Sequence, residues 1–174
     1  MADLMIDIEG LGTGPDATIL TIAAQEFDPL RRDVLGRHFY TRVTLESQND
    51  RCIQQDTLDW WATQPTQVRE EAFAETDRVS LTDALQGLHR LAFHARHVWA
   101  QGPTYDMNIL EHAYKSLNMP LPWRFFSVRD SRTLFSLVPE LNTYPASHHA
   151  LEDCRRQIKL LWDCMEYLKI KEIK

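Results

Sequence analysis

The sequence predicts an α/β protein with a mixed central sheet, which begins with three antiparallel strands and continues with strands that alternate with helices. Three observations support this fold class. Three apolar segments joined by short turns open the chain, helical periodicity dominates after them, and short apolar runs recur between the helices. The 174 residues suffice for one domain with a sizeable core, so we expect a single domain over residues 1–174.

Apolar and β-branched runs predict the strands. The first run ends at Gly10, where three glycines and a proline within six residues predict a turn, and Asp28-Pro29 ends the second. The third run alternates polar and apolar side chains, which is typical of a half-exposed strand. The predicted strands are residues 4–9, 17–24, 37–44, 98–101 and 125–128.

Capping residues and the helical spacing of apolar side chains predict the helices. Asp56 is a candidate N-cap, and Ser80 opens a helix with Asp83 at the position where a capping box usually has Glu or Gln. The last helix has Ser147 as a candidate N-cap. The predicted helices are residues 56–62, 65–73, 81–91, 106–117 and those from 150 onward.

Composition limits the class of protein. Hydrophobic residues make up 44% of the chain and charged residues 25%, which indicates a globular protein. The formal net charge of −6 disfavours a protein that coats long duplexes, because such proteins are usually basic. Three cysteines without a CxxC pair disfavour a zinc site and fit a reducing cytoplasm. No apolar stretch reaches bilayer length and no secretory signal is evident, so we expect no membrane partner.

Two acids lie at the end of the first strand. Side chains alternate along a strand, so Asp7 and Glu9 point to one face while Ile6 and Ile8 point to the other. Neighbouring carboxylates repel each other, and a hard cation such as Mg²⁺ or Mn²⁺ between them removes that cost. Two interpretations are open at this point, a metal site or a solvated edge strand.

Further acids and histidines follow later in the chain. Asp106 comes after a predicted buried strand, where α/β folds place ligands, although Asp at a helix start is also a common N-cap. Asp153 shares a helix face with His149, four residues earlier. His148 is five residues from Asp153, about 140° round a regular helix, so these two converge only if His148 lies in the preceding loop. A histidine there is well placed to take a proton from water.

These residues occur in an order that resembles a known family. Asp7 and Glu9, then Asp106, then His148 and Asp153 resemble the three motifs of the DEDDh 3′-5′ exonucleases, a branch of the ribonuclease H-like superfamily. The wider likeness is to a small phage and bacterial subgroup of exodeoxyribonuclease VIII-like and mycobacterial exoribonuclease-like proteins. It is carried by residues 5–13, 58–61, 128–134 and 148–154 and extends over most of the chain.

The resemblance implies a ribonuclease H-like fold and a site for two divalent ions, Mg²⁺ or Mn²⁺. Asp7, Glu9, Asp106 and Asp153 would hold the ions, one of which activates water while the other stabilises the leaving oxygen. His148 would be the general base, because its spacing from Asp153 matches the family.

The resemblance also implies contacts with the terminal nucleotide. Gly10 would offer a backbone N–H near the 3′-hydroxyl, and Leu11 would wedge against the base. Trp60 and Trp61 would stack a base, and because adjacent helical residues point about 100° apart, we expect one of them to do so and the other to be core. Gly10 stands where the wider family often has Thr, a change expected to alter the fit of the substrate.

The leading hypothesis is a metal-dependent 3′-5′ exonuclease that releases nucleoside monophosphates from the 3′ ends of single-stranded DNA or RNA. The alternatives are a catalytically weakened protein that binds nucleic-acid ends or a partner, and an enzyme restricted to very short oligonucleotides. A dinucleotide-binding interpretation of the glycine-rich turn fails, because Pro15 stands where the fingerprint needs a third glycine.

Other properties stay open on the sequence alone. No residue can be assigned to a contact with the 2′-hydroxyl, which distinguishes RNA from DNA, so the sequence does not predict which of the two is the substrate. A homodimer is an arrangement that family relatives often adopt and that nothing in the sequence requires. Several arginines would form either a phosphate-binding rim or a solvated surface. They are Arg124, Arg129, Arg132, Arg155 and Arg156.

Overall fold

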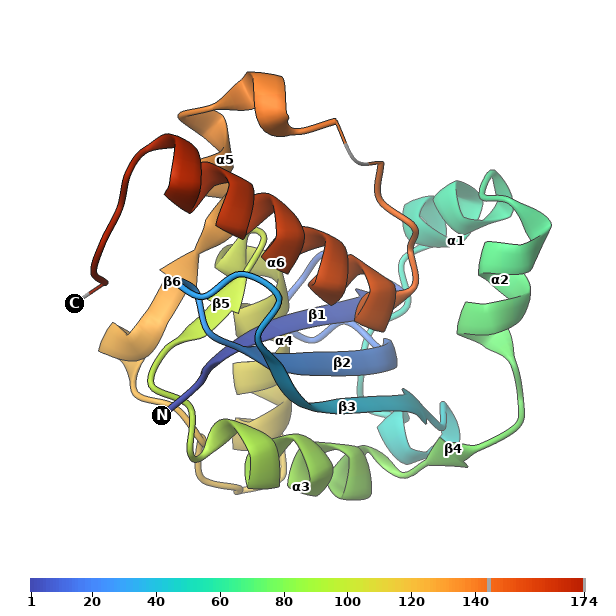
Figure 1. Ribbon diagram of the computed structural model, residues 1–174. Coiled ribbons are helices and arrows are strands. Elements are labelled where there is room, and N and C mark those ends of the chain that lie inside the picture. The colour runs from blue at the N-terminus through green and yellow to red at the C-terminus, as the bar shows by residue number, and fades with distance from the viewer. Residues whose placement is uncertain (144, 174) are drawn as a thin grey trace.

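The computed structural model describes residues 1–143 and 145–173 (Figure 1). A mixed sheet with the strand order β4-β3-β2-β1-β5-β6 forms its centre. The strands are β1 (Asp3–Gly10), β2 (Ile19–Phe27), β3 (Leu35–Val43), β4 (Arg78–Val79), β5 (Val98–Ala100) and β6 (Val128–Asp130). The α-helices are α1 (Gln55–Ala62), α2 (Thr66–Phe73), α3 (Leu81–Ala92), α4 (Pro103–Ser116), α5 (Ser131–Ser136) and α6 (Ala150–Tyr167).

The sheet topology confirms the predicted fold class. Strands β1, β2 and β3 are antiparallel neighbours, and β5 and β6 then continue parallel to β1. Strand β1 therefore lies inside the sheet, between β2 and β5, and not at an edge. The interpretation of its two acids as part of a solvated edge strand is wrong.

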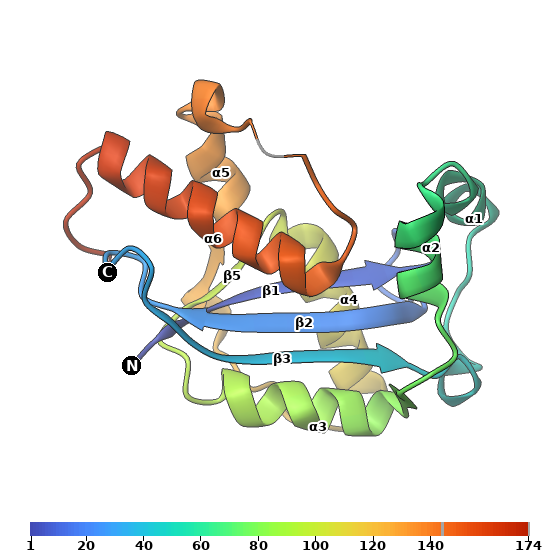
Figure 2. The same cartoon turned by 45° about the vertical axis from the view of Figure 1, so that its right-hand side comes forward.

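Helices cover both faces of the sheet, and the alternation of β1 decides which face each side chain meets. Leu4, Ile6 and Ile8 belong to the core formed with α3 and α4, whereas Met5 belongs to the core formed with α6. Figures 1 and 2 show α6 across one face and α3 along the other. Asp7, two residues after Met5, points to the α6 face, as strand alternation predicts.

Helices α1 and α2 lie beyond the carboxyl end of β1 in both views (Figures 1 and 2). Trp61 anchors α1 there, packed with Leu11, Leu20 and Ala72. Its Nε1 also donates a hydrogen bond of 3.0 Å to the carbonyl oxygen of Gly10. Helices α1 and α2 thus flank the end of β1 that carries the acids.

Several predicted boundaries are wrong. Helix α1 has Gln54 at its N-cap without a side-chain bond, and Asp56 lies inside the first turn. A 3-10 helix over Phe125–Ser127 replaces most of the predicted strand at 125–128, and β6 begins only at Val128. The short elements β4 and α5 were not predicted, because two and six residues are too few for a clear period.

The start of α3 agrees with the prediction, whereas that of α6 does not. Ser80 caps α3 by accepting a hydrogen bond of 3.1 Å from the backbone N–H of Asp83. The N-cap of α6 is His149 and not Ser147. None of the helices in the described part of the chain is long and apolar enough to cross a membrane.

Candidate active site

The four acids of the three motifs and His148 line one pocket of about 270 Å³. The pocket lies where β1, the first turn of α4 and the start of α6 meet. One strand and two helices that are far apart in sequence therefore supply the acids of one site, at the carboxyl end of β1, where α/β folds commonly bind ligands. The pocket is lined by Asp7, Ile8, Glu9, Gln101, Tyr105, Asp106, Arg132, Ala146, His148, Asp153, Arg156 and Gln157.

Strand β1 positions the first two acids. Asp7 and Glu9 are half-buried. Oδ1 of Asp7 accepts a hydrogen bond of 2.7 Å from Nε2 of Gln157, which follows Asp153 by one turn of α6. A β-bulge between Glu9 and Gly10 interrupts the ladder just after the second acid. Bulges redirect side chains and are frequent beside active sites.

Asp106 comes from the first turn of α4. Gly102 precedes the helix with a φ of 98°, a left-handed conformation that favours glycine, and Pro103 is the first helical residue. Asp106 is therefore not the N-cap of its helix. It is 4% exposed, and its Oδ1 accepts a hydrogen bond of 3.2 Å from the N–H of Ile8, which connects α4 to β1 between the two acids of that strand.

Asp153 organises the loop that carries His148. Its Oδ1 accepts hydrogen bonds from the N–H of Ser147 at 2.9 Å and from Nε of Arg156 at 3.0 Å, and its Oδ2 accepts one from the N–H of His148 at 2.7 Å. His148 lies before α6 with a φ of 56°, so it belongs to the loop, as convergence with Asp153 requires. An ionised carboxylate has about four acceptor sites, so three donors leave room for another ligand.

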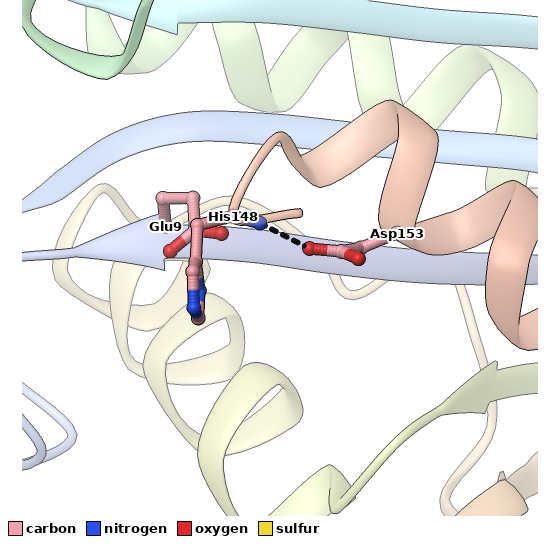
Figure 3. A group of neighbouring side chains, drawn as sticks. All are labelled: Glu9, His148 and Asp153. Atoms are coloured by element: carbon pink, nitrogen blue, oxygen red, sulfur yellow. Dashed lines mark hydrogen bonds between the residues drawn. The ribbon is translucent and has the colours of Figure 1, made fainter. Parts of the chain in front are cut away.

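Glu9, His148 and Asp153 form a compact group of candidate ligands. One ligand atom from each of the three side chains lies within 4.8 Å of the others. Figure 3 shows them coming together from β1, from the loop before α6 and from α6 itself. His148 is thus close enough to the acids to bind a cation with them or to accept a proton beside them.

Burial favours the protonated forms of three of the acids, and repulsion by neighbouring acids adds to this effect for two of them, Asp7 and Glu9. Burial and then the charges of Asp106, Glu9 and Asp153 raise the pKa of Asp7 well above its usual value. Burial, followed by the charges of Asp153 and Asp106, raises the pKa of Glu9 to about 8. Burial raises the pKa of Asp106 to about 7, against the opposing hydrogen bond from Ile8. A bound cation would favour the ionised forms, so the electrostatics fit a metal site.

A second pocket of about 530 Å³ adjoins the acids, and Glu9 and Tyr105 line both pockets. Trp60 is 41% exposed and lines the second pocket, and its ring lies 5.0 Å from the ring of His148 at an interplanar angle of 85°. The second pocket is lined by Glu9, Gly10, Gly12, Thr13, Gln54, Asp56, Thr57, Trp60 and Tyr105.

The structure separates the two tryptophans and buries Leu11. Leu11 and Trp61 are each 2% exposed and pack in the same core cluster. Gly10 lines the second pocket and accepts the indole N–H of Trp61 at its carbonyl oxygen. Trp60 is therefore the tryptophan that faces the pocket, and Trp61 is the core residue of the pair.

His149 lies outside both pockets and supports the loop from the other side. Its ring stacks on Tyr40 of β3, with centroids 4.8 Å apart and planes at 21°. Its Nε2 lies 3.5 Å from Oε1 of Glu71 on α2, and the Tyr40 hydroxyl donates to the same oxygen at 2.6 Å. The residue next to His148 is thus attached to β3 and to α2.

Sequence reasoning missed several lining residues, among them Gln101, Tyr105 and Gln157. The available signals were local, because Tyr105 directly precedes a motif acid and Gln157 lies four residues after another on the same helix face. Of the five arginines in the expected rim, Arg132 and Arg156 line the pocket that contains the four acids, called the acid pocket below. Tertiary placement separates these two from the others.

One curated relative is the exodeoxyribonuclease of Enterobacteria phage T4. The alignment with it is 206 positions long at 23% identity and covers 96% of this chain and 90% of the phage protein.

Solved structures show the same fold. The nuclease domain of 3′hExo, described as a DEDDh family member bound to rAMP, has a TM-score of 0.64 at 12% identity, with 95% of this chain and 92% of that chain covered. Pop2p from S. pombe, in a form with Mg²⁺ and Mn²⁺, has a TM-score of 0.62 at 11% identity and coverages of 98% and 85%. Exonuclease X, in complex with 5′ overhanging duplex DNA, has a TM-score of 0.59 at 18% identity and coverages of 97% and 93%.

The match to a family model is the most specific comparison. The model describes a 3′-5′ exoribonuclease Rv2179c-like domain and matches residues 2–165. These residues contain all three acidic motifs and both pockets. The chain therefore belongs to the Rv2179c-like family of 3′-5′ exonuclease domains.

Proposed function

We propose that this protein is a metal-dependent exonuclease that hydrolyses the 3′-terminal phosphodiester bond of single-stranded DNA or RNA and releases nucleoside monophosphates. The observation that carries the proposal is the convergence of Asp7, Glu9, Asp106 and Asp153 with His148 in one pocket. Membership of an exonuclease family supports it, as does the presence of Mg²⁺ and Mn²⁺ in the structural neighbour Pop2p.

The donor set fits divalent cations. Carboxylate oxygens are the ligands that Mg²⁺ and Mn²⁺ prefer. Buried and closely spaced carboxylates without a cation have raised pKa values, as Asp7 and Glu9 do, and burial alone raises that of Asp106. Asp7, Glu9, Asp106 and Asp153 would hold two ions. When bound, the ions supply a lower pKa for water and electrostatic stabilisation of the leaving oxygen.

Other side chains of the pocket have separate tasks in this proposal. His148 accepts the proton of the attacking water, and its position is held by the backbone bonds to Asp153. Arg132 and Arg156 line the same pocket and offset the charge of the phosphate. No other histidine lines either pocket among the described residues, which supports His148 as the base.

The second pocket receives the terminal nucleoside. Trp60 stacks the base, a contact that tolerates any base because every base has a flat face. Gly10 brings the backbone close to the sugar. Leu11 and Trp61 support this wall from the core, since their burial leaves them little surface for a direct contact.

The test is digestion of 5′-labelled single-stranded oligonucleotides, DNA and RNA in parallel and at several lengths, with Mg²⁺, with Mn²⁺ and with EDTA. We expect a ladder that shortens from the 3′ end with either metal and disappears with EDTA. Asp7→Asn should abolish the ladder and keep the fold, because it removes one ligand and one repulsive charge. Asp50→Asn, which changes an exposed acid outside both pockets, is the matched control and should retain full activity.

Other outcomes would contradict the proposal. A ladder that persists in EDTA would exclude a metal-dependent mechanism. Tight binding of the oligonucleotides without cleavage at any metal concentration would favour the alternative of an end-binding protein. Cleavage confined to the shortest oligonucleotides would identify the restricted enzyme instead.

A further inference from the structure

Tyr105 stands at the boundary between the two pockets. It belongs to the first turn of α4, directly before Asp106. Only Glu9 and Tyr105, among the described residues, line both the acid pocket and the pocket that contains Trp60. A nucleotide with its phosphate at the acids and its base beside Trp60 must therefore pass its sugar across Glu9 and Tyr105.

The hydroxyl group of Tyr105 has a proton to donate. No hydrogen bond links it to another residue in the described part of the chain. The ordinary pKa of a tyrosine hydroxyl is about 10, so the group carries its proton at neutral pH. A half-buried hydroxyl without a protein partner, on the wall of a pocket, is suited to a ligand acceptor.

Gly10 makes room for this hydroxyl. A Cβ atom at position 10 would lie 3.2 Å from the Tyr105 oxygen and 3.0 Å from the carbonyl oxygen of Thr18. Both contacts are tighter than ordinary van der Waals contact, and the carbonyl belongs to the backbone and cannot turn away. The absence of a side chain at Gly10 and the position of the Tyr105 hydroxyl are thus complementary.

We infer that the Tyr105 hydroxyl determines specificity for a free 3′-hydroxyl on the terminal sugar, and that Gly10 provides the space this contact needs. The inference rests on the proposed function. A sugar hydroxyl both donates and accepts, so it can accept from Tyr105 and donate to the carboxylate of Glu9 on the same boundary. A 3′-deoxy end lacks both capacities, and a 3′-phosphate adds negative charge beside the acids.

The test compares kcat/KM for two 5′-labelled oligonucleotides at saturating Mg²⁺. The two substrates differ only in having a 3′-hydroxyl or a 3′-deoxy end. We expect the protein to prefer the 3′-hydroxyl end. Tyr105→Phe should lower kcat/KM for that end by about tenfold, as expected for one hydrogen bond, and leave the 3′-deoxy end unchanged. The preference for the 3′-hydroxyl should shrink accordingly.

The same helix offers a matched control. Tyr114 is also on α4, and its hydroxyl donates a hydrogen bond of 2.8 Å to the carbonyl oxygen of Leu85 in the core. Tyr114→Phe also removes one hydroxyl group, but from the core. It should lower the melting temperature and leave the ratio of kcat/KM between the two ends unchanged. A fall in both activities with Tyr105→Phe at an unchanged ratio would mean that Tyr105 is merely structural, and would overturn the inference.

Gly10→Ala tests the second half. Its methyl group should displace the Tyr105 hydroxyl and reduce the preference for the 3′-hydroxyl end. Gly10→Ala should reduce this preference less when it is made in the Tyr105→Phe background, because the hydroxyl group is already absent there. An equal reduction of the preference in both backgrounds would attribute the effect of Gly10→Ala to the contact with Thr18 alone. It would overturn the role of Gly10 in making room for the hydroxyl group. Failure of the unaltered protein to digest either end with Mg²⁺ or Mn²⁺ would instead refute the proposed function.

Discussion

Gln157 donates a hydrogen bond of 2.7 Å from its Nε2 to Oδ1 of Asp7, 150 residues earlier in the chain. This bond connects α6 to the central strand, and it lowers the pKa of Asp7 against the larger effect of burial. The amide oxygen of Gln157, Oε1, is buried and has no hydrogen-bond partner among the described residues. Gln157 therefore orients an acid of the site while remaining incompletely satisfied itself.

Gln157→Leu should make the site harder to load with metal. Without the donor, Asp7 ionises less readily, and only the ionised carboxylate binds a cation. We expect a higher Mg²⁺ concentration at half-maximal activity and a shift of the acidic limb of the kcat/KM profile to higher pH. Gln86→Leu, the same change on the exposed face of α3, should alter neither quantity. An unshifted pH profile in Gln157→Leu would show that the bond does not tune Asp7.

Stability should fall with rising pH when no divalent metal is present. The pKa values of Glu9 and Asp106 are raised to about 8 and about 7 in the folded protein, whereas both acids titrate near 4 when unfolded. Between these values the folded state binds more protons, so the free energy of unfolding decreases as pH rises from about 4 to about 8. In EDTA we expect the melting temperature to drop by several degrees between pH 5.5 and pH 8.

Divalent metal and a neutral variant provide the controls for this pH dependence. Mg²⁺ or Mn²⁺ should stabilise the protein much more at pH 8 than at pH 5.5, because the acids are then ionised. Asp106→Asn should weaken the pH dependence in EDTA, since one of the raised groups is removed. An equal effect of metal at both pH values would contradict the assignment of these acids as ligands.

The two adjacent tryptophans should respond differently to truncation. Trp61→Ala empties a core position and breaks the bond to Gly10, so it should cost about 3–5 kcal/mol of stability. Trp60→Ala should leave the melting temperature nearly unchanged and raise KM by about 5- to 150-fold, because stacking is worth about 1–3 kcal/mol per base. Thermal melting and steady-state kinetics on the same preparations measure both. Unaltered KM in Trp60→Ala would exclude base stacking at this residue.

The two adjacent histidines form a second natural comparison. His148→Ala should lower kcat by about 10²–10⁴-fold with little change in KM, as expected for loss of a general base. His149→Ala removes the stacking on Tyr40 and the contact with Glu71, so it should lower the melting temperature and reduce kcat much less. The reverse order of the two kcat effects would assign the proton transfer to His149.

A buried acid at the opposite end of β1 should matter for stability alone. Asp3 is fully buried and accepts hydrogen bonds from Nε of Arg96 at 2.9 Å and from Nε1 of Trp99 at 2.8 Å, while Nδ1 of His97 lies 3.1 Å from its Oδ2. Asp3→Asn should cost about 1.5–3 kcal/mol, the range for hydrogen bonds to a charged group. Activity below the unfolding transition should stay within twofold. A large loss of kcat would show coupling between the two ends of the strand.

Local patterns predicted much of the fold and most of the acid set. The alternation in β1 placed Asp7 and Glu9 on one face, and the structure agrees because side chains alternate along any extended backbone. The start of α4 was predicted wrongly, because Gly102 and Pro103 begin the helix one turn before Asp106. A left-handed glycine is a property of the folded backbone, and the sequence does not distinguish it from an ordinary turn glycine.

Periodicity and motif spacing run along the chain, so the fold class, the family motifs and the candidate ligands could be predicted without coordinates. Which side chains share a pocket depends on how the elements pack together. This packing buried Trp61 and exposed Trp60, placed His148 in a loop beside Asp153, and brought the Tyr105 hydroxyl against Gly10. These relationships join residues from different elements, and packing of those elements is not encoded in any local pattern.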